Sequence, residues 1–178
     1  MDTMFETLYK RKTVRTFTGE KISDDELQEI LKSANSSPVG MGKYDSLHLS
    51  VVTNAQLLEK IDKAGAVMFG KPDIHPLYGA PMLVIVSSKN PSVGMENVAY
   101  SNCAIVAHNM ALAGTALNVG VCYIWGATMA ICNNSEILKE LNLPKDFVPC
   151  CAVALGKTNQ IYAERQIPMD RISSNYIF

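Results

Sequence analysis

Four basic side chains and a threonine hydroxyl fall within six residues near the start of the chain. They are Lys10, Arg11, Lys12, Thr13 and Arg15. Guanidinium and ammonium groups next to a hydroxyl are donors suited to binding a phosphate group. A charged run is more often an ordinary solvated turn, so composition alone favours that simpler interpretation. Features elsewhere in the chain must decide between the two.

Two such features raise the case for a phosphate site. The aromatic Phe17 follows the run closely, and it would anchor the chain and fix the direction of the basic side chains. Lys157 and Arg165 come just after the last apolar segment, where ligand sites of sheet proteins tend to lie. The two distant basic clusters could therefore converge on one phosphate.

The overall charge makes any phosphate recognition local. Sixteen basic and seventeen acidic residues give a net charge of −1, so no global field attracts nucleic acid or an anionic membrane. The first residues lack a basic segment followed by an apolar one, which predicts a cytoplasmic protein without a targeting segment. The length of 178 residues predicts a single domain over residues 1–178.

The periodicity of apolar residues predicts about five helices alternating with four strands. Ser23 and Glu26 form a capping box ahead of apolar residues at helical spacing, which is the best-marked helix start. The other expected helices begin near Met4 or cover residues 54–61, 98–117 and 136–141. The expected strands cover residues 47–53, 82–86, 121–124 and 149–155. These elements predict one α+β unit in three layers, with a sheet flanked by helices.

The segment over residues 98–117 is nearly long and apolar enough to cross a bilayer. Ser101, Asn102, His108 and Asn109 argue against a membrane span, because their polar groups would be costly to bury in hydrocarbon. We expect a helix in the core of the protein instead.

Several other kinds of site are not supported. Residues 65–71 match the start of a phosphate-binding P-loop, but Pro72 stands where the motif needs a hydroxyl. Gly40 and Gly42 follow a predicted helix rather than a strand, and Asp45 occupies the place of the third glycine of a dinucleotide-binding motif. The histidines and cysteines show no metal-binding or hydrolase spacing.

The five cysteines show no C-x-x-C pair and no disulfide framework. We expect buried structural thiols. Cys150 and Cys151 are neighbours in a predicted strand, so their side chains should point to opposite faces.

An ordered set of segments resembles the FMN-dependent nitroreductase family over nearly the whole chain. Residues 11–17 resemble the family's R-R-S-x-R-x-F opening, and residues 33–40 its A-x-x-A-P-S segment. Ala80-Pro81 is similar to its A-P-x-x-I-x-V, and residues 117–126 to its A-L-G-L-G-x-x-W-I-G. The last strand through Lys157, with Arg165 and Pro168 beyond it, is similar to its closing segments.

The resemblance implies a nitroreductase-like fold with a mostly antiparallel central sheet and an intertwined homodimer. It further implies that FMN lies at the subunit interface, and that the tail over about residues 158–178 packs on the partner subunit. The residues it assigns to FMN are Arg11, Lys12, Thr13, Arg15, Pro38, Val39, Gly40, Ile124, Trp125, Gly126, Lys157 and Arg165. The first four would hold the phosphate and ribityl chain, and Pro38, Val39 and Gly40 would approach the ring from the other subunit.

The implied activity is a flavoprotein oxidoreductase that takes hydride from NADH or NADPH and reduces nitroaromatic or quinone acceptors by a ping-pong mechanism. The chemistry would belong to the flavin, and no catalytic acid is assigned. Met41 and Tyr44 occupy the stretch where relatives often place Asn and Gln, so they are candidates for the substrate pocket.

Three alternatives stay open at this point. The same fold could perform another reduction, such as dehalogenation or ene reduction. The protein could bind or sense flavin without significant turnover. Without flavin, it could be an interaction domain whose basic run is a solvated turn.

Overall fold

The structure is a computed structural model that describes residues 3–178. Its framework is a four-stranded sheet in which every neighbouring pair is antiparallel, in the order β1-β2-β4-β3. The strands are β1 (Leu47–Val52), β2 (Met82–Lys89), β3 (Gly120–Ile124) and β4 (Phe147–Gly156). The predicted antiparallel sheet flanked by helices is confirmed.

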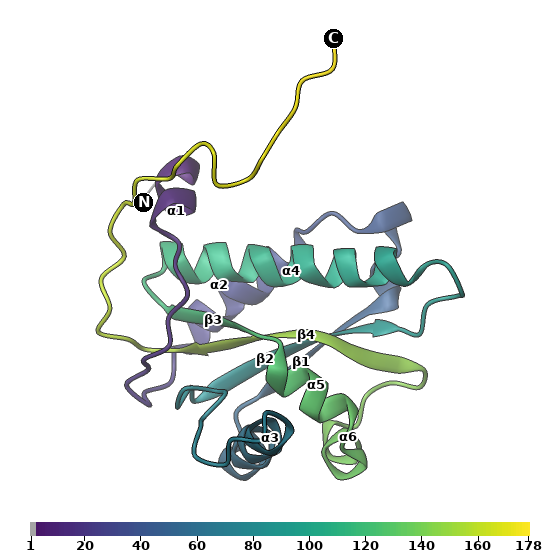
Figure 1. Cartoon of the computed structure of the whole chain (residues 1–178). Helices are drawn as coiled ribbons and strands as arrows, with labels where there is room; N and C mark the ends of the chain where they lie inside the picture. The colour runs from purple at the N-terminus through teal and green to yellow at the C-terminus, as the bar shows by residue number, and fades with distance from the viewer. Residues whose placement is uncertain (1–2) are drawn as a thin grey trace.

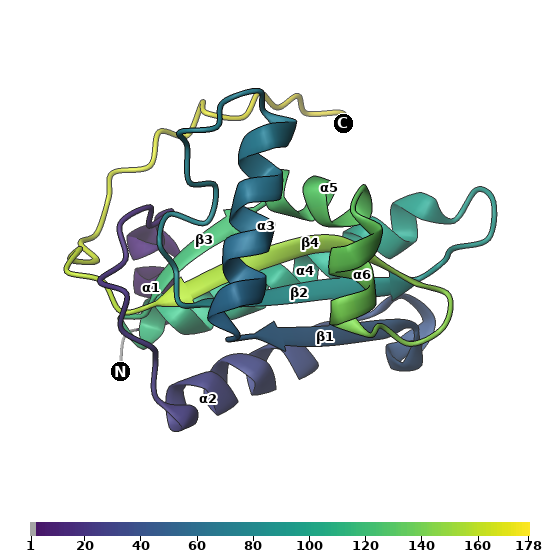
Figure 2. The same ribbon diagram turned by 90° about the horizontal axis from the view of Figure 1, so that it is seen from below.

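Helices cover both faces of the sheet. One face is covered by α2 (Asp24–Asn35) and α4 (Glu96–Ala116), as Figure 1 shows. The other is covered by α3 (Ala55–Met68), α5 (Gly126–Cys132) and α6 (Ser135–Leu141), which lie in front of the strands in Figure 2. The short α1 (Met4–Lys10) lies outside these layers, against α4.

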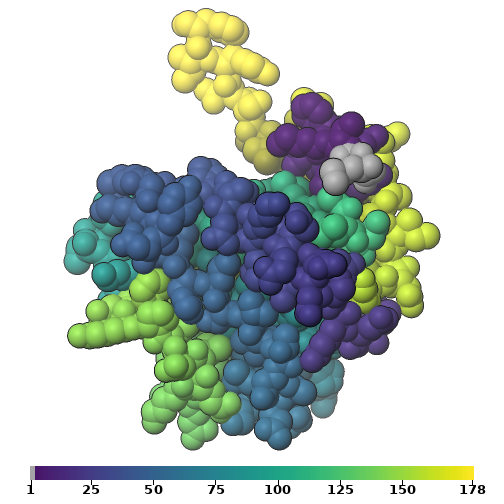
Figure 3. All heavy atoms as spheres, turned by 180° about the vertical axis from the view of Figure 1, so that it is seen from behind, coloured from purple at the N-terminus to yellow at the C-terminus, as the bar shows by residue number. Residues whose placement is uncertain are grey.

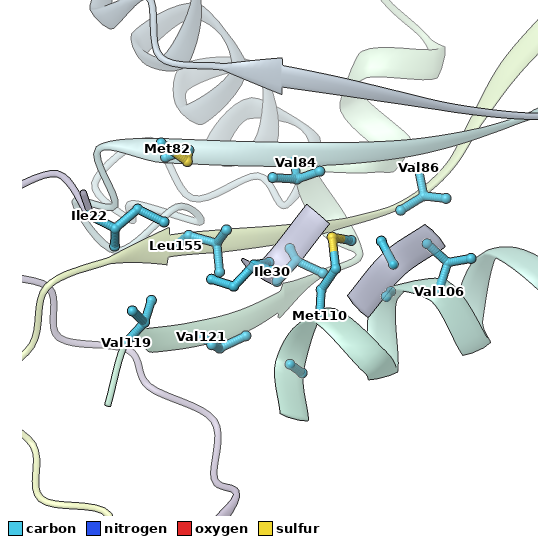
Figure 4. Packing of buried hydrophobic residues seen from close by; sticks show 14 of the residues in the cluster. Ile22, Ile30, Met82, Val84, Val86, Val106, Met110, Val119, Val121 and Leu155 are labelled. Atoms are coloured by element: carbon cyan, nitrogen blue, oxygen red, sulfur yellow. The ribbon is translucent and has the colours of Figure 1, made fainter. Parts of the chain in front are cut away.

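Each face of the sheet carries its own apolar core. On the α2 and α4 side, Ile30 and Met110 are fully buried against Val84 and Leu155 of the central strands (Figure 4). On the other side, Ile61 and Ile131 pack with Leu83 and Ile85. Because β2 is covered on both faces, its residues through Ser88 are all buried, as the continuous apolar run predicts.

Local sequence explains where most elements start. Ser23 accepts a hydrogen bond from the Glu26 backbone, and the Glu26 carboxylate accepts one from the Ser23 backbone, which completes the predicted capping box. Asn54 caps α3 through the Leu57 backbone N–H. That helix continues to Met68, seven residues beyond the expected end at Ile61, because Leu57, Ile61 and Ala66 keep one apolar face on the core.

One helix was not expected from the sequence, and the structure answers two questions that the sequence raised, on the P-loop match and on a membrane span. The helix α5 follows directly after β3 and was not expected. The P-loop match at residues 65–71 begins inside α3, so it forms no phosphate-binding loop. Within residues 3–178, no helix combines the length and the apolarity needed to cross a bilayer.

Cys150 and Cys151 do not point to opposite faces, contrary to the sequence expectation. On β2, Val86 is opposite Cys151 and Ser87 is opposite Pro149, so Cys150 is an extra residue in a β-bulge. A bulge interrupts the alternation of side chains along a strand. Both thiols therefore pack on the α4 side of the sheet.

Candidate functional site

The residues that follow α1 form an extended segment, residues 11–18, which we call the basic segment. The Val14 backbone N–H donates to the Val121 carbonyl of β3 at 2.8 Å. Further along, the Thr18 N–H donates to the Lys157 carbonyl at 3.0 Å. Val14 is completely buried, so the segment is fixed to the sheet at its middle and at its end. Its basic side chains project from a rigid base.

Phe17 anchors the basic segment through two glycines that face each other on β3 and β4. A Cβ on Gly120 would lie 3.0 Å from the Phe17 ring and 3.0 Å from the Gly156 carbonyl oxygen. A Cβ on Gly156 would lie 3.1 Å from the same ring and 2.6 Å from Pro81. The ring needs this space, because such contacts are too short for ordinary packing.

Arg11 lies near the α4 side of β3. Burial lowers the pKa of His108 on α4, and the positive charge of Arg11 lowers it further. Burial raises the pKa of Tyr123 on β3 to about 12, with the Arg11 charge acting in the opposite direction. The Arg11 charge therefore acts on two groups of the same face of the sheet.

Arg15 lies near the opposite side of the same strand. Its guanidinium carbon is 5.8 Å from the centre of the Tyr78 ring, a cation–π contact. Burial raises the pKa of Cys122, whose side chain packs in the core under α3 and α5, and the Arg15 charge opposes that rise. The two arginines thus flank the outer strand of the sheet.

No carboxylate forms an ion pair with Arg11 or Arg15 among residues 3–178. Thr13, between them, is partly exposed. Unpaired guanidinium groups on a rigid segment favour binding of an anion, because no internal partner has to be displaced.

The chain after β4 returns to the basic segment. The Lys12 ammonium donates to the Ile161 carbonyl at 2.9 Å and lies 5.8 Å from the centre of the Tyr162 ring. The Arg165 Nε–H donates to the Tyr9 carbonyl, in the last turn of α1, at 3.0 Å. The structure therefore places Ile161 against Lys12 of the basic segment, and Arg165 against the end of α1 that precedes it.

Lys157 has a different position from the one that a shared phosphate site would require. Its backbone contacts Thr18, but its ammonium group bonds the Glu26 carboxylate at 2.6 and 2.8 Å. Burial acts to raise the pKa of Glu26, and the hydrogen bonds from Lys157 and Ser23 outweigh it, so the pKa is lowered. The structure does not bring the ammonium group to Arg11.

Pro38, Val39 and Gly40 lie beside the N-terminal part of α4, whereas α1 lies over its C-terminal part (Figure 1). The Gly40 N–H donates to the Asn102 side chain at 3.0 Å. A cavity of about 380 Å³ opens next to Gly40 and Met41. Within one chain these residues and the basic segment do not meet.

The third predicted group lies where β3 turns into α5. Ile124 is buried, whereas Trp125 is 66% exposed. A Cβ on Gly126 would lie 2.4 Å from the Phe69 ring, so only glycine fits without a shift of the ring. The backbone at this corner is open on one side and packed on the other.

The comparisons with known proteins match this fold and almost the whole chain. The model of the nitroreductase family matches residues 8–73 and 72–157. The chain belongs to the nitroreductase family. A solved nitroreductase with bound FMN from Bacteroides fragilis is 27% identical, with a TM-score of 0.81, and the similarity covers 99% of this chain and all of that one.

Two curated relatives of the family are also similar. A protein from Archaeoglobus fulgidus, described as a candidate NADH dehydrogenase/NAD(P)H nitroreductase, is 26% identical over 88% of this chain and 86% of its own length. The FMN reductase (NADPH) of Bacillus subtilis is 24% identical over 88% of this chain and 66% of its own length.

In this nitroreductase-family chain, one polar pair near the basic segment could not be predicted from the sequence. The Tyr123 hydroxyl lies 2.7 Å from His108 Nδ1, and the two rings are nearly parallel. The residues are fifteen positions apart, on β3 and α4, so no local motif contains both. Burial raises the pKa of Tyr123 and lowers that of His108, so both groups are neutral near pH 7 and one hydrogen bond joins the hydroxyl and Nδ1.

The two candidate substrate residues have different surroundings. Met41 is 70% exposed and has a backbone φ of 58°, in the left-handed region. The Tyr44 hydroxyl donates to the Ser37 carbonyl at 3.2 Å, which holds the loop back on itself. Met41 lines the cavity beside Gly40, and Tyr44 supports the loop that bears it.

Proposed function

We propose that this protein is an FMN-dependent oxidoreductase that takes hydride from NADH or NADPH and reduces nitroaromatic or quinone acceptors by a ping-pong mechanism. Membership of the nitroreductase family supports the proposal. So do the FMN in the solved Bacteroides relative and the name of the Bacillus relative, FMN reductase (NADPH). The physical support comes from the basic segment.

The observation that carries the proposal is that Arg11 and Arg15 lie on a segment fixed to the sheet and have no carboxylate partner among residues 3–178. Arg11, with Lys12 and Arg165 beside it, supplies positive charge for the FMN phosphate, and the Thr13 hydroxyl adds a neutral donor. Each charge-assisted hydrogen bond is worth about 1.5 to 3 kcal/mol. The residues present therefore fit an FMN phosphate.

Arg15 is the residue we assign to the ring end of the cofactor. It lies on the side of β3 whose side chains include Cys122 and Ile124, and Ile124 directly precedes the corner at Trp125 and Gly126. FMN, when bound, accepts hydride and passes electrons to the acceptor. A fixed guanidinium near the ring would stabilise negative charge on the reduced cofactor, and the packed corner at Gly126 limits motion of the backbone there.

Lys157 has a positioning role in this proposal. Its pairing with Glu26 ties the end of β4 to α2, and the Thr18 hydrogen bond to the Lys157 carbonyl ties the basic segment to the same point. We therefore assign the phosphate to Arg11, Lys12, Thr13 and Arg165, and treat Lys157 as the residue that fixes their base.

We further propose a homodimer with the site at its interface. Apolar and small residues occur all around α4, and Tyr100, Ile105 and Ala104 remain exposed on its outer side. A helix that is apolar on every side is normally buried. Closing a second copy over this face would bring Pro38, Val39 and Gly40 of one subunit toward the basic segment of the other.

The test is whether the purified protein carries flavin and uses it. Flavin released by heat should be FMN, and NADH or NADPH added without oxygen should bleach it. A nitroaromatic or quinone should then restore the colour. If FMN binds but neither NADH nor NADPH bleaches it, the protein binds flavin without acting as a nicotinamide-dependent reductase. Protein that neither contains nor binds FMN would refute the proposal.

Three variants locate the cofactor. Arg11→Ala should weaken FMN binding by about 10- to 100-fold, the equivalent of one lost charge-assisted hydrogen bond. Lys157→Met should change it by less than about threefold, because its ammonium group already has a carboxylate partner. Lys63→Ala is the matched control, since Lys63 pairs with Glu59 on α3, away from the basic segment. Equal losses in all three would contradict the assignment.

A further inference from the structure

Three thiols meet where the bulge of β4 faces α4. Cys103 of α4 is fully buried, and its backbone carbonyl accepts a hydrogen bond from the Cys151 thiol at 3.4 Å. Cys150 packs against the same apolar cluster, its thiol donates to the Val148 carbonyl at 3.5 Å, and its sulfur interacts with the Cys103 thiol. The bulge causes this arrangement, because a regular strand would have placed Cys150 on the opposite side of the sheet.

The position of Cys150 leaves it open to small molecules. The neighbouring strand β3 ends at Ile124, which is opposite Ala152, so β4 has no partner on that side at Cys150. Cys150 is partly exposed, whereas Cys103 beneath it is fully buried. One thiol of the pair is therefore accessible, and the other is protected behind it.

The two sulfur atoms also differ in their tendency to ionise. The hydrogen bond from Cys103 lowers the pKa of Cys150, burial opposes that effect, and a hydrogen bond with the Ser88 backbone lowers the pKa further. The pKa of Cys103 is raised, first by the same hydrogen bond and then by burial. Since a thiolate is the reactive form of cysteine, the accessible sulfur is also the more nucleophilic one.

We propose that Cys150 and Cys103 are a peroxide-sensitive dithiol that closes into a disulfide between β4 and α4. This role is independent of flavin chemistry. Such a reaction has two steps. An accessible thiol first reacts with the peroxide, and a second thiol beside it then forms the disulfide.

The reaction balances with hydrogen peroxide as the oxidant. The Cys150 thiol first releases its proton, and the thiolate attacks one peroxide oxygen. The O–O bond breaks, Cys150 becomes a sulfenic acid, and the departing hydroxide takes up the released proton to form water. The Cys103 sulfur then attacks the sulfur of the Cys150 sulfenic acid. The S–O bond breaks, hydroxide leaves with the Cys103 proton as a second water, and the S–S bond forms. Two thiols lose two electrons, and one peroxide gains them.

The other thiols serve as internal comparisons. The Cys151 thiol is held on the Cys103 carbonyl, and burial raises its pKa to about 12, so it is a weaker nucleophile. Cys132 is exposed, but burial and the neighbouring Cys150 raise the pKa of its thiol. Cys122 is buried on the other side of the sheet and should not react.

The test is a peroxide titration of the full-length protein, followed by alkylation of the remaining thiols and mass spectrometry. Chymotrypsin suits the digestion, because it cleaves after Tyr100, Leu112, Tyr123 and Trp125 and so separates Cys103, Cys122 and Cys132. Cys150 and Cys151 are adjacent, so fragmentation of the cross-linked peptide must distinguish them. The expected product is one cross-link, Cys103 to Cys150.

Two variants make the result decisive. Cys150→Ser should reduce the oxidation of Cys103 more than tenfold, because no sulfenic acid forms beside it, whereas Cys132→Ser, the exposed control, should leave the Cys103–Cys150 cross-link unchanged. Cys150 is partly exposed, and circular dichroism will verify that its variant is folded. A Cys150–Cys151 link, a link between two chains through Cys132, or oxidation of Cys132 alone would each overturn the proposal. So would oxidation of Cys103 to the wild-type extent in Cys150→Ser.

Discussion

The ammonium group of Lys157 lies 2.6 Å from the Glu26 carboxylate, and this pair joins the end of β4 to the first turn of α2. The same carboxylate accepts the Ser23 backbone N–H at 2.7 Å. Glu26 is thus both a helix cap and the partner of the lysine whose carbonyl holds the basic segment. A helix, a strand and a candidate phosphate site depend on one side chain.

The first prediction is that Glu26→Gln destabilises the protein by about 1 to 2 kcal/mol near neutral pH, a value between those of exposed and buried pairs. Glutamine can still accept the hydrogen bond from Ser23, so the variant isolates the charge. Because the pKa of Glu26 is lowered by folding, its contribution is complete above its unfolded value of 4.5 and is lost as the pH falls through the folded value.

Urea unfolding at about pH 7 and about pH 3 measures this contribution. The difference between wild type and Glu26→Gln should be present at the higher pH and should shrink at the lower one. Lys32→Met is the control, because Lys32 forms an exposed pair with Glu29 on the same helix. If the difference in unfolding free energy stays constant with pH, the charge of the Glu26 carboxylate does not contribute to stability.

The second prediction concerns Gly114, where α4 packs against Val121 of β3. A Cβ at this position would lie 2.4 Å from Val121 Cγ2. Helix propensity alone would make Gly114→Ala stabilising by about 1 kcal/mol, whereas overpacking of a core costs about 1 to 3 kcal/mol. We expect net destabilisation by denaturant unfolding, because Val121 is buried and cannot move freely. In a Val121→Ala background the same change should become neutral or stabilising.

Much of the fold could be predicted from local signals. The capping box at Ser23 and the apolar run that became β2 are determined by residues close in sequence, and both elements appear where they were expected. The family resemblance gave the antiparallel sheet, which periodicity alone did not. The length of α3 was underestimated, because its apolar face continues beyond Ile61 and the helix packs against α5.

The features that the sequence could not give depend on contacts between distant segments. The partner of Lys157 is 131 residues away, so its ion pair with Glu26 has no local pattern. The bulge at Cys150 depends on its register with β2, and the His108–Tyr123 pair depends on how α4 crosses β3. The role of each candidate residue toward FMN stays a prediction.

The third prediction is that Arg11→Ala raises the pKa of His108. Burial and the Arg11 charge both lower this pKa from its ordinary value of 6.5. Removing the guanidinium removes the second cause and leaves the first, so the pKa should rise but stay below 6.5. NMR titration of the His108 ring proton measures it directly. Lys63→Ala should cause no change, and an unchanged value in Arg11→Ala would place the guanidinium elsewhere.

The last prediction concerns the three apolar residues that end the chain. Tyr176, Ile177 and Phe178 are 80%, 91% and 113% exposed, and the tail stands away from the body of the molecule in Figure 3. Each could contribute about 1.5 to 3 kcal/mol if it were buried against a partner subunit. Deleting residues 176–178 should therefore weaken dimerisation by at least about tenfold.

Sedimentation over a range of concentrations measures that change. Replacing the three residues with serine should have the same effect as deleting them, because the lost stabilisation comes from apolar side chains rather than from chain length. Val67→Ser on α3 is a matched control, since Val67 is 74% exposed on another face. The unfolding free energy of the isolated subunit should not change, because these side chains cover little of their own chain. A dimer of unchanged stability would place the tail outside the interface.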